Sequence, residues 1–127
     1  MWYRAGLPYA VDPYSLETLG PADSNGALPS ISAHSRPDEH TGELLWFDYS
    51  LKAPYMRYGV LGPDRKPRHA IDIDLPGPSL PHDMAITPNY SILHDLPLFY
   101  DAGALAAGLT LGALPDTGAT TRRVAGV

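Results

Sequence analysis

The segment HDMAITPNYSILHDLP (residues 82–97) decides the fold, because two short apolar stretches flank a turn signal in it. Asp83–Thr87 and Tyr90–His94 alternate apolar and polar side chains with the period of two that is typical of a strand. Pro88 and Asn89 between them favour a turn. The segment therefore predicts two short strands joined by a turn, and it contains the pair His-Asp twice.

Similar stretches recur upstream at intervals of about ten residues. In Leu44–Ser50, alternate side chains point to opposite sides of the expected strand. The same interpretation covers three further ranges, Tyr9–Asp12, Pro54–Val60 and His69–Asp74. No long amphipathic helix is indicated. The pattern predicts an antiparallel all-β chain, and it leaves sandwich, barrel and propeller open.

A loose recurrence links two turn segments of the chain. Asp12–Thr18 and Pro37–Leu44 each place an acidic residue, a hydroxyl residue and a glutamate between expected strands. Repetition of this type is typical of propeller blades. The high content of turn-forming residues, 12 glycines and 14 prolines among 127 residues, agrees with short strands and many turns.

Composition excludes several classes of protein. Nine basic and fourteen acidic side chains give a net charge of −5, and the basic residues are scattered, so we expect no nucleic-acid partner. The chain has no cysteine, which excludes disulfides and thiolate metal sites and leaves nitrogen and oxygen as metal ligands. Met1–Arg4 does not resemble a secretory signal, and Ala102–Pro115 is too short to span a membrane, so we expect a cytoplasmic protein.

The composition and the hydrophobic pattern of the sequence change near its C-terminal end. From Gly103 onward it is rich in Ala, Gly and Thr, lacks aromatic residues and shows no clear alternation. We therefore divide the chain into residues 1–107, a β domain, and residues 108–127, an atypical tail that we expect to be loosely ordered.

Two of the five histidines lie where a strand meets a loop, the position at which β folds place binding groups. His34 follows a short stretch of small residues, and His82 precedes the strand Asp83–Thr87. Each is either a rim histidine bonded to backbone or a metal ligand. We expect His40 to be solvated in a turn, His69 to be exposed, and His94 to be structural.

Three segments carry a resemblance to a known family. They are AGLPYAVDPYSLETLG (residues 5–20), SAHSRPDEHTGELLWFDYS (residues 32–50) and PSLPHDMAITPNYSILHDLPL (residues 78–98). In this order they resemble the signature stretches of the carotenoid cleavage oxygenase family, which includes apocarotenoid oxygenases and lignostilbene dioxygenases. The resemblance covers about residues 2–107.

The resemblance implies a seven-bladed β-propeller that holds one non-haem Fe(2+) on four histidines. His34 matches the first ligand and His82 the second, whereas His94 matches a position that is not a ligand. Family members use O2 to cleave a carbon–carbon double bond of a polyene or stilbene, giving two carbonyl products. Arg4 stands where the family has a glutamate that accepts a ring N–H of a ligand histidine, and an arginine is unable to accept it.

The resemblance further implies about two blades of the propeller, an incomplete set, because the remaining ligands and glutamates of the family lie further along a longer chain. We expect a fragment of such a dioxygenase, from a truncated, frame-shifted or decayed gene copy, that is inactive alone and self-associates through its sheet edges. The expected substrate is a small hydrophobic carotenoid, apocarotenoid or stilbene. Contact with a membrane surface is implied for the full-length relative.

Two alternatives stay open. In the first, the chain is a non-catalytic β module that presents an aromatic surface to a hydrophobic ligand or partner. The side chains of this surface are Tyr9, Trp46, Tyr49, Tyr55 and Tyr58. Alternatively, His34 and His82 form a small metal site with a carboxylate such as Asp83 in a homo-oligomer.

Overall fold

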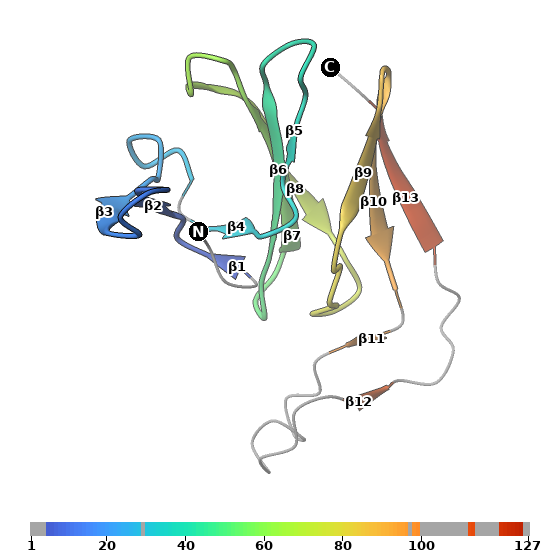
Figure 1. Cartoon of the computed structure of the whole chain (residues 1–127). Coiled ribbons are helices and arrows are strands. Elements are labelled where there is room, and N and C mark those ends of the chain that lie inside the picture. The colour runs from blue at the N-terminus through green and yellow to red at the C-terminus, as the bar shows by residue number, and fades with distance from the viewer. Residues whose placement is uncertain (1–4, 29, 97, 100–111, 114–119, 126–127) are drawn as a thin grey trace. The chain divides into compact units, whose positions relative to one another are not determined.

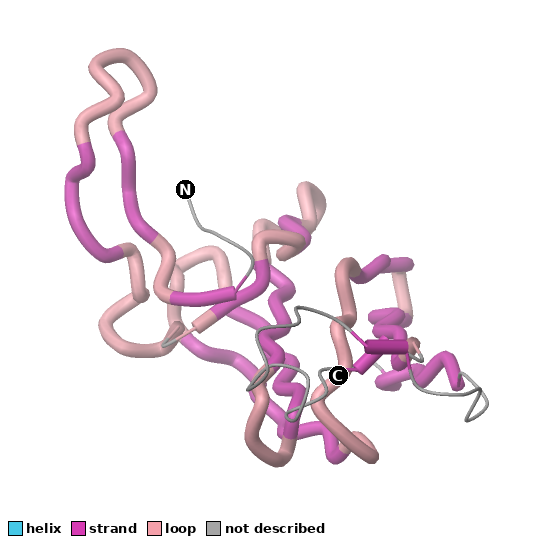
Figure 2. The backbone as a smooth tube through the Cα atoms, turned by 90° about the horizontal axis from the view of Figure 1, so that it is seen from below, coloured by secondary structure: helices cyan, strands magenta, loops and turns pink. Residues whose placement is uncertain are grey.

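The computed structural model describes residues 5–28, 30–96, 98–99, 112–113 and 120–125. All regular elements in these residues are β-strands, drawn in magenta in Figure 2, and none is a helix. The prediction of an all-β chain is therefore confirmed for the part of the chain that the structure describes. Within the same residues, no helix that could cross a membrane is found.

The six strands predicted from the sequence are confirmed, with their ends shifted by one or two residues, and shorter strands are added between them. The elements are β1 (Ala5–Gly6), β2 (Tyr9–Val11), β3 (Thr18–Pro21), β4 (Ile31–Ser32), β5 (Arg36–Pro37), β6 (Leu44–Tyr49), β7 (Tyr55–Leu61), β8 (Pro67–Asp74), β9 (Met84–Thr87), β10 (Tyr90–Asp95), β11 (Leu98–Phe99), β12 (Gly112–Ala113) and β13 (Thr120–Ala125).

Two larger sheets organise these strands (Figure 1). One has four strands in the order β5-β6-β7-β8, and the other has three in the order β13-β10-β9. The pairs β1-β4, β2-β3 and β11-β12 are small antiparallel sheets. The chain divides into two compact units, Met1–Asp48 with Tyr58–Ile71, and Tyr49–Arg57 with Asp72–Val127.

The core of the first unit is a cluster around one indole ring. Trp46 of β6 packs with Leu28, Ile31 and Leu61, all at most 3 % exposed, and Leu44 and Ala27 pack against this cluster. Burying each such side chain contributes roughly 1.5–3 kcal/mol. These contacts hold the loop before β4, β4 itself and the strands β6 and β7 together.

The two faces of β6 differ less than its sequence predicts. In an alternating strand Phe47 and Trp46 point to opposite sides, and such alternation is typical of one buried and one exposed face. The structure buries both, with 0 % of Phe47 and 3 % of Trp46 exposed. The strand therefore has no solvent-facing side at its centre.

Gly59 of β7 permits the close approach of that strand to Trp46. A Cβ atom at this position would lie 2.5 Å from the Trp46 ring atom Cζ2 and 2.9 Å from the carbonyl oxygen of His69. Both distances are shorter than real Cβ contacts allow, and the His69 oxygen belongs to backbone that has little freedom to move.

We expect Gly59→Ala to lower the free energy of unfolding by about 1–3 kcal/mol, because the added methyl group overpacks the core against the indole ring. Urea denaturation followed by tryptophan fluorescence measures this. Ala70→Ser, at an exposed position of the neighbouring strand β8, serves as the control and should leave stability nearly unchanged. Equal midpoints for Gly59→Ala and the unaltered chain would show that β7 does not press against the ring.

The recurrence seen in the sequence is a repeated turn in the structure. In the first copy, the Asp12 N–H donates to the Glu17 carbonyl at 2.9 Å, and the Leu16 N–H donates to the Asp12 carbonyl at 2.9 Å. In the second copy, Asp38 and Glu43 form the same bond at 2.9 Å, and the Gly42 N–H donates to the Asp38 carbonyl at 2.8 Å. The two turns share one hydrogen-bond pattern.

Each aspartate also caps its turn with its carboxylate. Asp12 Oδ1 accepts the N–H groups of Tyr14 and Ser15, both at 2.8 Å, and Asp38 Oδ1 accepts the N–H of His40 at 2.8 Å. The Ser15 and Tyr14 N–H groups lower the pKa of Asp12, and the His40 N–H lowers the pKa of Asp38. Hydrogen bonds of this kind favour the ionised carboxylate.

The fifth position of each turn adopts the left-handed conformation. Gly42 has φ 73° there, and Leu16 has φ 62°. Glycine adopts this conformation without steric cost, whereas a side chain with a Cβ costs roughly 1–2 kcal/mol. The first copy of the turn is therefore strained at Leu16, and the second is not.

Replacing Leu16 by glycine should raise the free energy of unfolding by about 1 kcal/mol, because relief of the strained φ exceeds the added chain entropy of glycine. Little burial is lost, since Leu16 is 74 % exposed. Gly42→Ala should have the opposite effect in the second copy. Thermal and urea unfolding measure both.

Tyr14→Gly is the matched control, because Tyr14 is exposed in the same turn and is not among the residues with positive φ. It should give no stabilisation. A gain from Tyr14→Gly as large as that from Leu16→Gly would contradict the assignment of strain to Leu16.

The second unit contains the two strands predicted within residues 82–97. β9 and β10 are antiparallel, with Met84 opposite Leu93 and Thr87 opposite Tyr90. The Tyr90 N–H donates to Thr87 Oγ1 at 3.0 Å and closes the turn. Met84, Ser91 and Leu93 are buried.

Part of the C-terminal tail joins this sheet. β13 pairs with β10 along its whole length, from Tyr90 opposite Ala125 to Asp95 opposite Thr120 (Figure 1). These tail residues therefore share a sheet with the strands of residues 82–97. For the rest of residues 108–127, apart from β12, the prediction of a loosely ordered tail lies outside the described residues.

Candidate metal ligands and their setting

The loop between β4 and β5 carries His34, and one buried serine fixes it. Ser32, at 0 % exposed, accepts the backbone N–H of His34 with its Oγ at 3.2 Å. Its carbonyl oxygen accepts the Ser35 hydroxyl at 3.0 Å. Ser32 is thus bound to the backbone of His34 and to the side chain of the next residue, and His34 is half-buried. These bonds restrict the backbone from which the His34 side chain projects, and a metal ligand requires a fixed backbone of this kind.

Sequence reasoning missed this role of Ser32. There, the residues before His34 count only as small residues. The available signal was the short-range pattern Ser32-Ala33-His34-Ser35, because serine hydroxyls readily bond to backbone two residues away.

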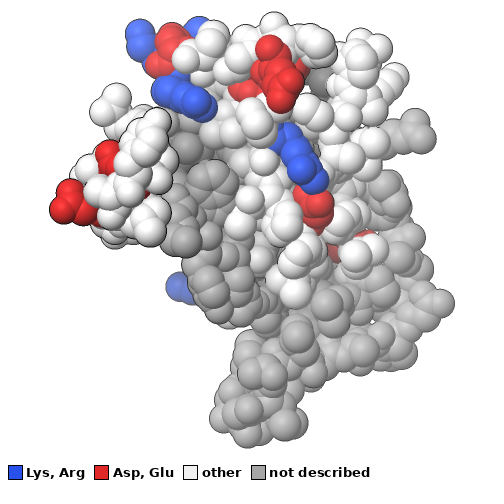
Figure 3. All heavy atoms as spheres, viewed as in Figure 1, with Lys and Arg blue, Asp and Glu red and all other residues white. Residues whose placement is uncertain are grey.

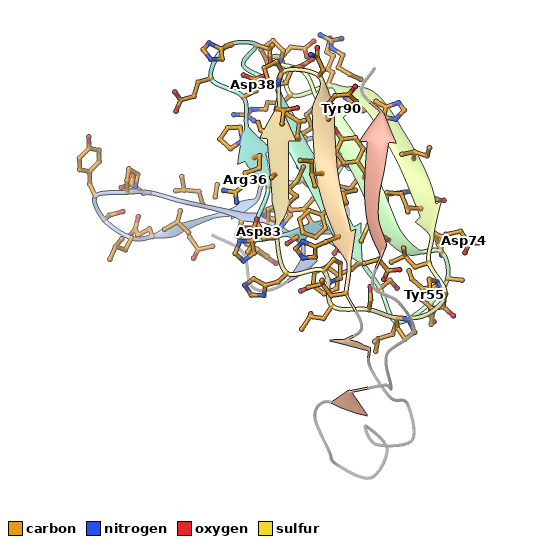
Figure 4. All side chains as sticks on the ribbon, turned by 90° about the vertical axis from the view of Figure 1, so that its right-hand side faces the viewer. Arg36, Asp38, Tyr55, Asp74, Asp83 and Tyr90 are labelled. Atoms are coloured by element: carbon orange, nitrogen blue, oxygen red, sulfur yellow. The ribbon has the colours of Figure 1, made fainter. Side chains whose placement is uncertain are left out.

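His82 lies just before β9 and is exposed, between two anchored neighbours. Pro81 is fully buried on one side, and Met84 is 3 % exposed on the other. Asp83 Oδ1 accepts the Met84 N–H at 2.7 Å, which fixes the entry into the strand. In Figure 4 the labelled Asp83 lies at the beginning of β9, at the opposite end of the hairpin from Tyr90. The backbone at His82 is therefore well defined although its ring is accessible.

The remaining histidines differ in how well their settings were predicted. His40 is exposed in the turn capped by Asp38, as expected. His69 was expected to be exposed, but it is half-buried in β8, with its ring centroid 6.3 Å from that of Tyr58. This neighbouring ring belongs to β7, so the sequence of β8 alone does not indicate it.

His94 lies in β10 and is half-buried. Its Nε2 atom is buried and has no hydrogen-bond partner among the described residues, and the same holds for Oδ1 of Asp95. A buried polar atom without a partner costs about 1–3 kcal/mol.

Two of the five side chains of the aromatic surface considered as an alternative are buried, whereas Tyr49 and Tyr55 are half-buried. Trp46 is 3 % and Tyr58 is 5 % exposed, and Trp46 belongs to the core cluster of the first unit. These two rings therefore stabilise the fold and are not available to a partner. Tyr9, at 43 % exposed, remains accessible.

The imidazole side chains of His34 and His82 are suitable metal ligands, but two ligands are too few to form a metal site. Imidazole nitrogen is a usual ligand for iron and other first-row metals. Among the described residues, no group of three or more His, Cys, Asp or Glu side chains lies close enough to hold a metal ion. Arg4, which stands at the glutamate position of the resembled family, lies outside the described residues.

Charge gives no sign of a nucleic-acid surface on the face drawn in Figure 3, where blue basic and red acidic groups intermingle over the described residues. Two of the basic side chains are paired with acids. Arg57 Nε lies 2.6 Å from Asp72 Oδ1, and Arg68 lies 3.1 Å from Asp64. Both pairs are about half exposed and contribute little to stability.

Comparison with known proteins gives one consistent result. Residues 1–120 match the family model described as retinal pigment epithelial membrane protein. The chain is 38 % identical over 108 residues to carotenoid 9,10(9',10')-cleavage dioxygenase 1 of Pisum sativum, covering 82 % of this chain and 20 % of the relative. It is 34 % identical over 129 residues to isoeugenol monooxygenase of Pseudomonas nitroreducens, covering 89 % of this chain and 27 % of the relative.

Solved structures agree. Lignostilbene dioxygenase of Pseudomonas brassicacearum superposes with a TM-score of 0.84 at 32 % identity, over 94 % of this chain and 26 % of that one. An apocarotenoid oxygenase variant of Synechocystis gives a TM-score of 0.74 at 26 % identity, over 97 % of this chain and 29 % of that one. A cobalt-substituted form of the Synechocystis enzyme, at 25 % identity and a TM-score of 0.68, is a further match.

The chain spans about a fifth of the length of the first curated relatives that it matches. The family model, however, covers nearly all of this chain, and the identities hold along most of it. The chain therefore belongs to the retinal pigment epithelial membrane protein family, the family of the carotenoid cleavage oxygenases.

Proposed function

We propose that the chain is part of a non-haem Fe(2+) dioxygenase that cleaves a carbon–carbon double bond of a carotenoid, apocarotenoid or stilbene substrate with O2. The observation that carries this proposal is the setting of the two motif histidines. His34 and His82 each lie beside a strand, and side-chain-to-backbone hydrogen bonds fix the neighbouring chain. Relatives bear the names carotenoid cleavage dioxygenase and lignostilbene dioxygenase.

His34 and His82 would supply two of the imidazole ligands to the iron. Bound iron would supply the activation of O2, which side chains do not provide. Neutral imidazoles leave the full positive charge of the metal in place. Ser32 would hold His34 in direction through the turn that it ties, and Asp83 would do the same for the chain at His82. The cobalt-substituted Synechocystis structure supports a metal in this family.

We also propose that the sheets of this chain are about two blades of a seven-bladed propeller. Two ligands do not complete a four-histidine site, so the 127-residue chain alone should be inactive. β8 is an edge strand of the four-stranded sheet, and β9 is an edge strand of the three-stranded sheet. Unpaired strand edges favour pairing with another chain, so the isolated chain should self-associate.

The isolated chain should bind Fe(2+) weakly, because two imidazoles lack the ligand count of a stable site. After anaerobic loading and desalting, metal analysis should find much less than one iron per chain. His34→Ala should change this small amount little. Stoichiometric iron that is retained by the unaltered chain and lost in His34→Ala would contradict the proposal.

Restoring the rest of the propeller tests the assignment of the two His-Asp pairs. Residues 2–101 replace the matching segment of the Pseudomonas brassicacearum lignostilbene dioxygenase, with Arg4 changed to Glu. In this chimera His82→Ala should abolish iron retention and substrate cleavage, because a ligand is lost. His94→Ala should keep both. Metal analysis and product detection after incubation with substrate and O2 measure these outcomes.

The same chimera tests the effect of Arg4. With arginine left in place, iron affinity should fall by roughly 10–100-fold, the usual effect of losing a hydrogen-bond acceptor behind a ligand histidine. Arg4→Gln is the control that removes the cation without restoring a carboxylate.

For the two His-Asp pairs, one outcome would contradict the assignment. If His94→Ala loses iron while His82→Ala retains it, the assignment of the two pairs is reversed.

A further inference from the structure

The first unit contains a cavity that neither candidate ligand lines. Its volume is about 630 Å³, within the usual range for small-molecule sites. Its wall combines residues far apart in the sequence, from β2 and the loop after β3 to the turn between β7 and β8. Its apolar lining residues are Pro8, Tyr9, Ala22, Leu28, Ile31, Pro37 and Leu44, and Ser24, Ser35 and Arg65 complete it.

The floor of this cavity is part of the core. Leu28 and Ile31 are at most 2 % exposed and pack with Trp46, and Leu44 packs against the same cluster. The floor is therefore preformed. Since apolar walls offer water few hydrogen-bond partners, an apolar molecule that displaces water from this space gains free energy.

Arg65 is the one charged residue that lines the cavity. The turn that carries it is closed by two backbone hydrogen bonds, Gly62 N–H to the Lys66 carbonyl and Arg65 N–H to the Gly62 carbonyl, both 2.8 Å. Arg65 adopts φ 61° there, in the left-handed region. The turn thus holds Arg65 at the cavity.

The guanidinium of Arg65 differs from those of its neighbours in the sheet. Arg57 and Arg68 each form an ion pair with an aspartate. No ion pair or side-chain hydrogen bond joins Arg65 to another residue of the described part of the chain, and no carboxylate lines the cavity. An arginine beside an apolar cavity is complementary to an anionic group, which it binds with two parallel hydrogen bonds.

We propose that this cavity binds an apolar monocarboxylic acid, with its hydrocarbon or aromatic body over Leu28, Ile31 and Leu44 and its carboxylate on Arg65. A single guanidinium matches a head group with a single charge. This inference does not rest on the proposed dioxygenase function, because neither His34 nor His82 lines the cavity. No sequence pattern predicts the site, since its wall is assembled from separate segments.

Titration with decanoate tests the proposal on the complete 127-residue chain. Trp46 lies under the floor of the cavity, so its fluorescence should change on binding, and isothermal titration calorimetry should give the dissociation constant. Decan-1-ol is the uncharged ligand of matched length and should bind more weakly. Arg65→Gln should weaken decanoate binding by about 10-fold or more, as expected for a lost charged hydrogen bond, and leave decanol binding unchanged.

Two further variants complete the test. Lys66→Gln removes the adjacent cation, which does not line the cavity, and should leave decanoate affinity unchanged. Ala22→Phe fills the cavity from an exposed lining position and should reduce the affinity for both ligands. The proposal is overturned if decanoate does not bind, if decanol binds as tightly as decanoate, or if Lys66→Gln weakens binding as much as Arg65→Gln.

Discussion

The packing of β7 against the indole of Trp46 is the constraint on which the first unit depends. Gly59 leaves room for the ring, and Leu28, Ile31 and Leu61 close around it. Ile31 is followed directly by Ser32, the buried residue that fixes the loop of His34. The position of a candidate metal ligand is therefore coupled to the core through one short strand. The arrangement has a cost, because Trp46 Nε1 is buried and has no hydrogen-bond partner within the described residues.

The repeated turn shows which parts of a sequence motif carry structural information. Asp12 and Asp38 cap their turns in the same way, and Glu17 and Glu43 accept the same backbone bond through their carbonyl groups. The left-handed position is occupied by Leu16 in one copy and Gly42 in the other. The aspartate therefore defines the turn, while the residue at the left-handed position sets only its strain. This explains why the recurrence was visible yet loose at the level of sequence.

Local patterns predicted the strands well, because alternation and turn residues act over a few neighbouring positions. They failed where burial depends on distant contacts. Phe47 and Trp46 are both buried, the ring of His69 packs near that of Tyr58 on the neighbouring strand, and His94 Nε2 is buried without a hydrogen-bond partner among the described residues. The cavity beside Arg65 was missed for the same reason. The roles of His34 and His82 were inferred from family motifs, since spacing alone left two interpretations open for each.

The central claim is that His34 and His82 are ligands of one iron in the complete propeller. Anomalous diffraction at the iron absorption edge, from crystals of the lignostilbene dioxygenase chimera with Arg4 changed to Glu, tests it most directly. The account predicts a single strong anomalous peak within bonding distance of a ring nitrogen of both His34 and His82, and none at His94. A peak bonded to His94, or one that contacts only one of the two motif histidines, would contradict it.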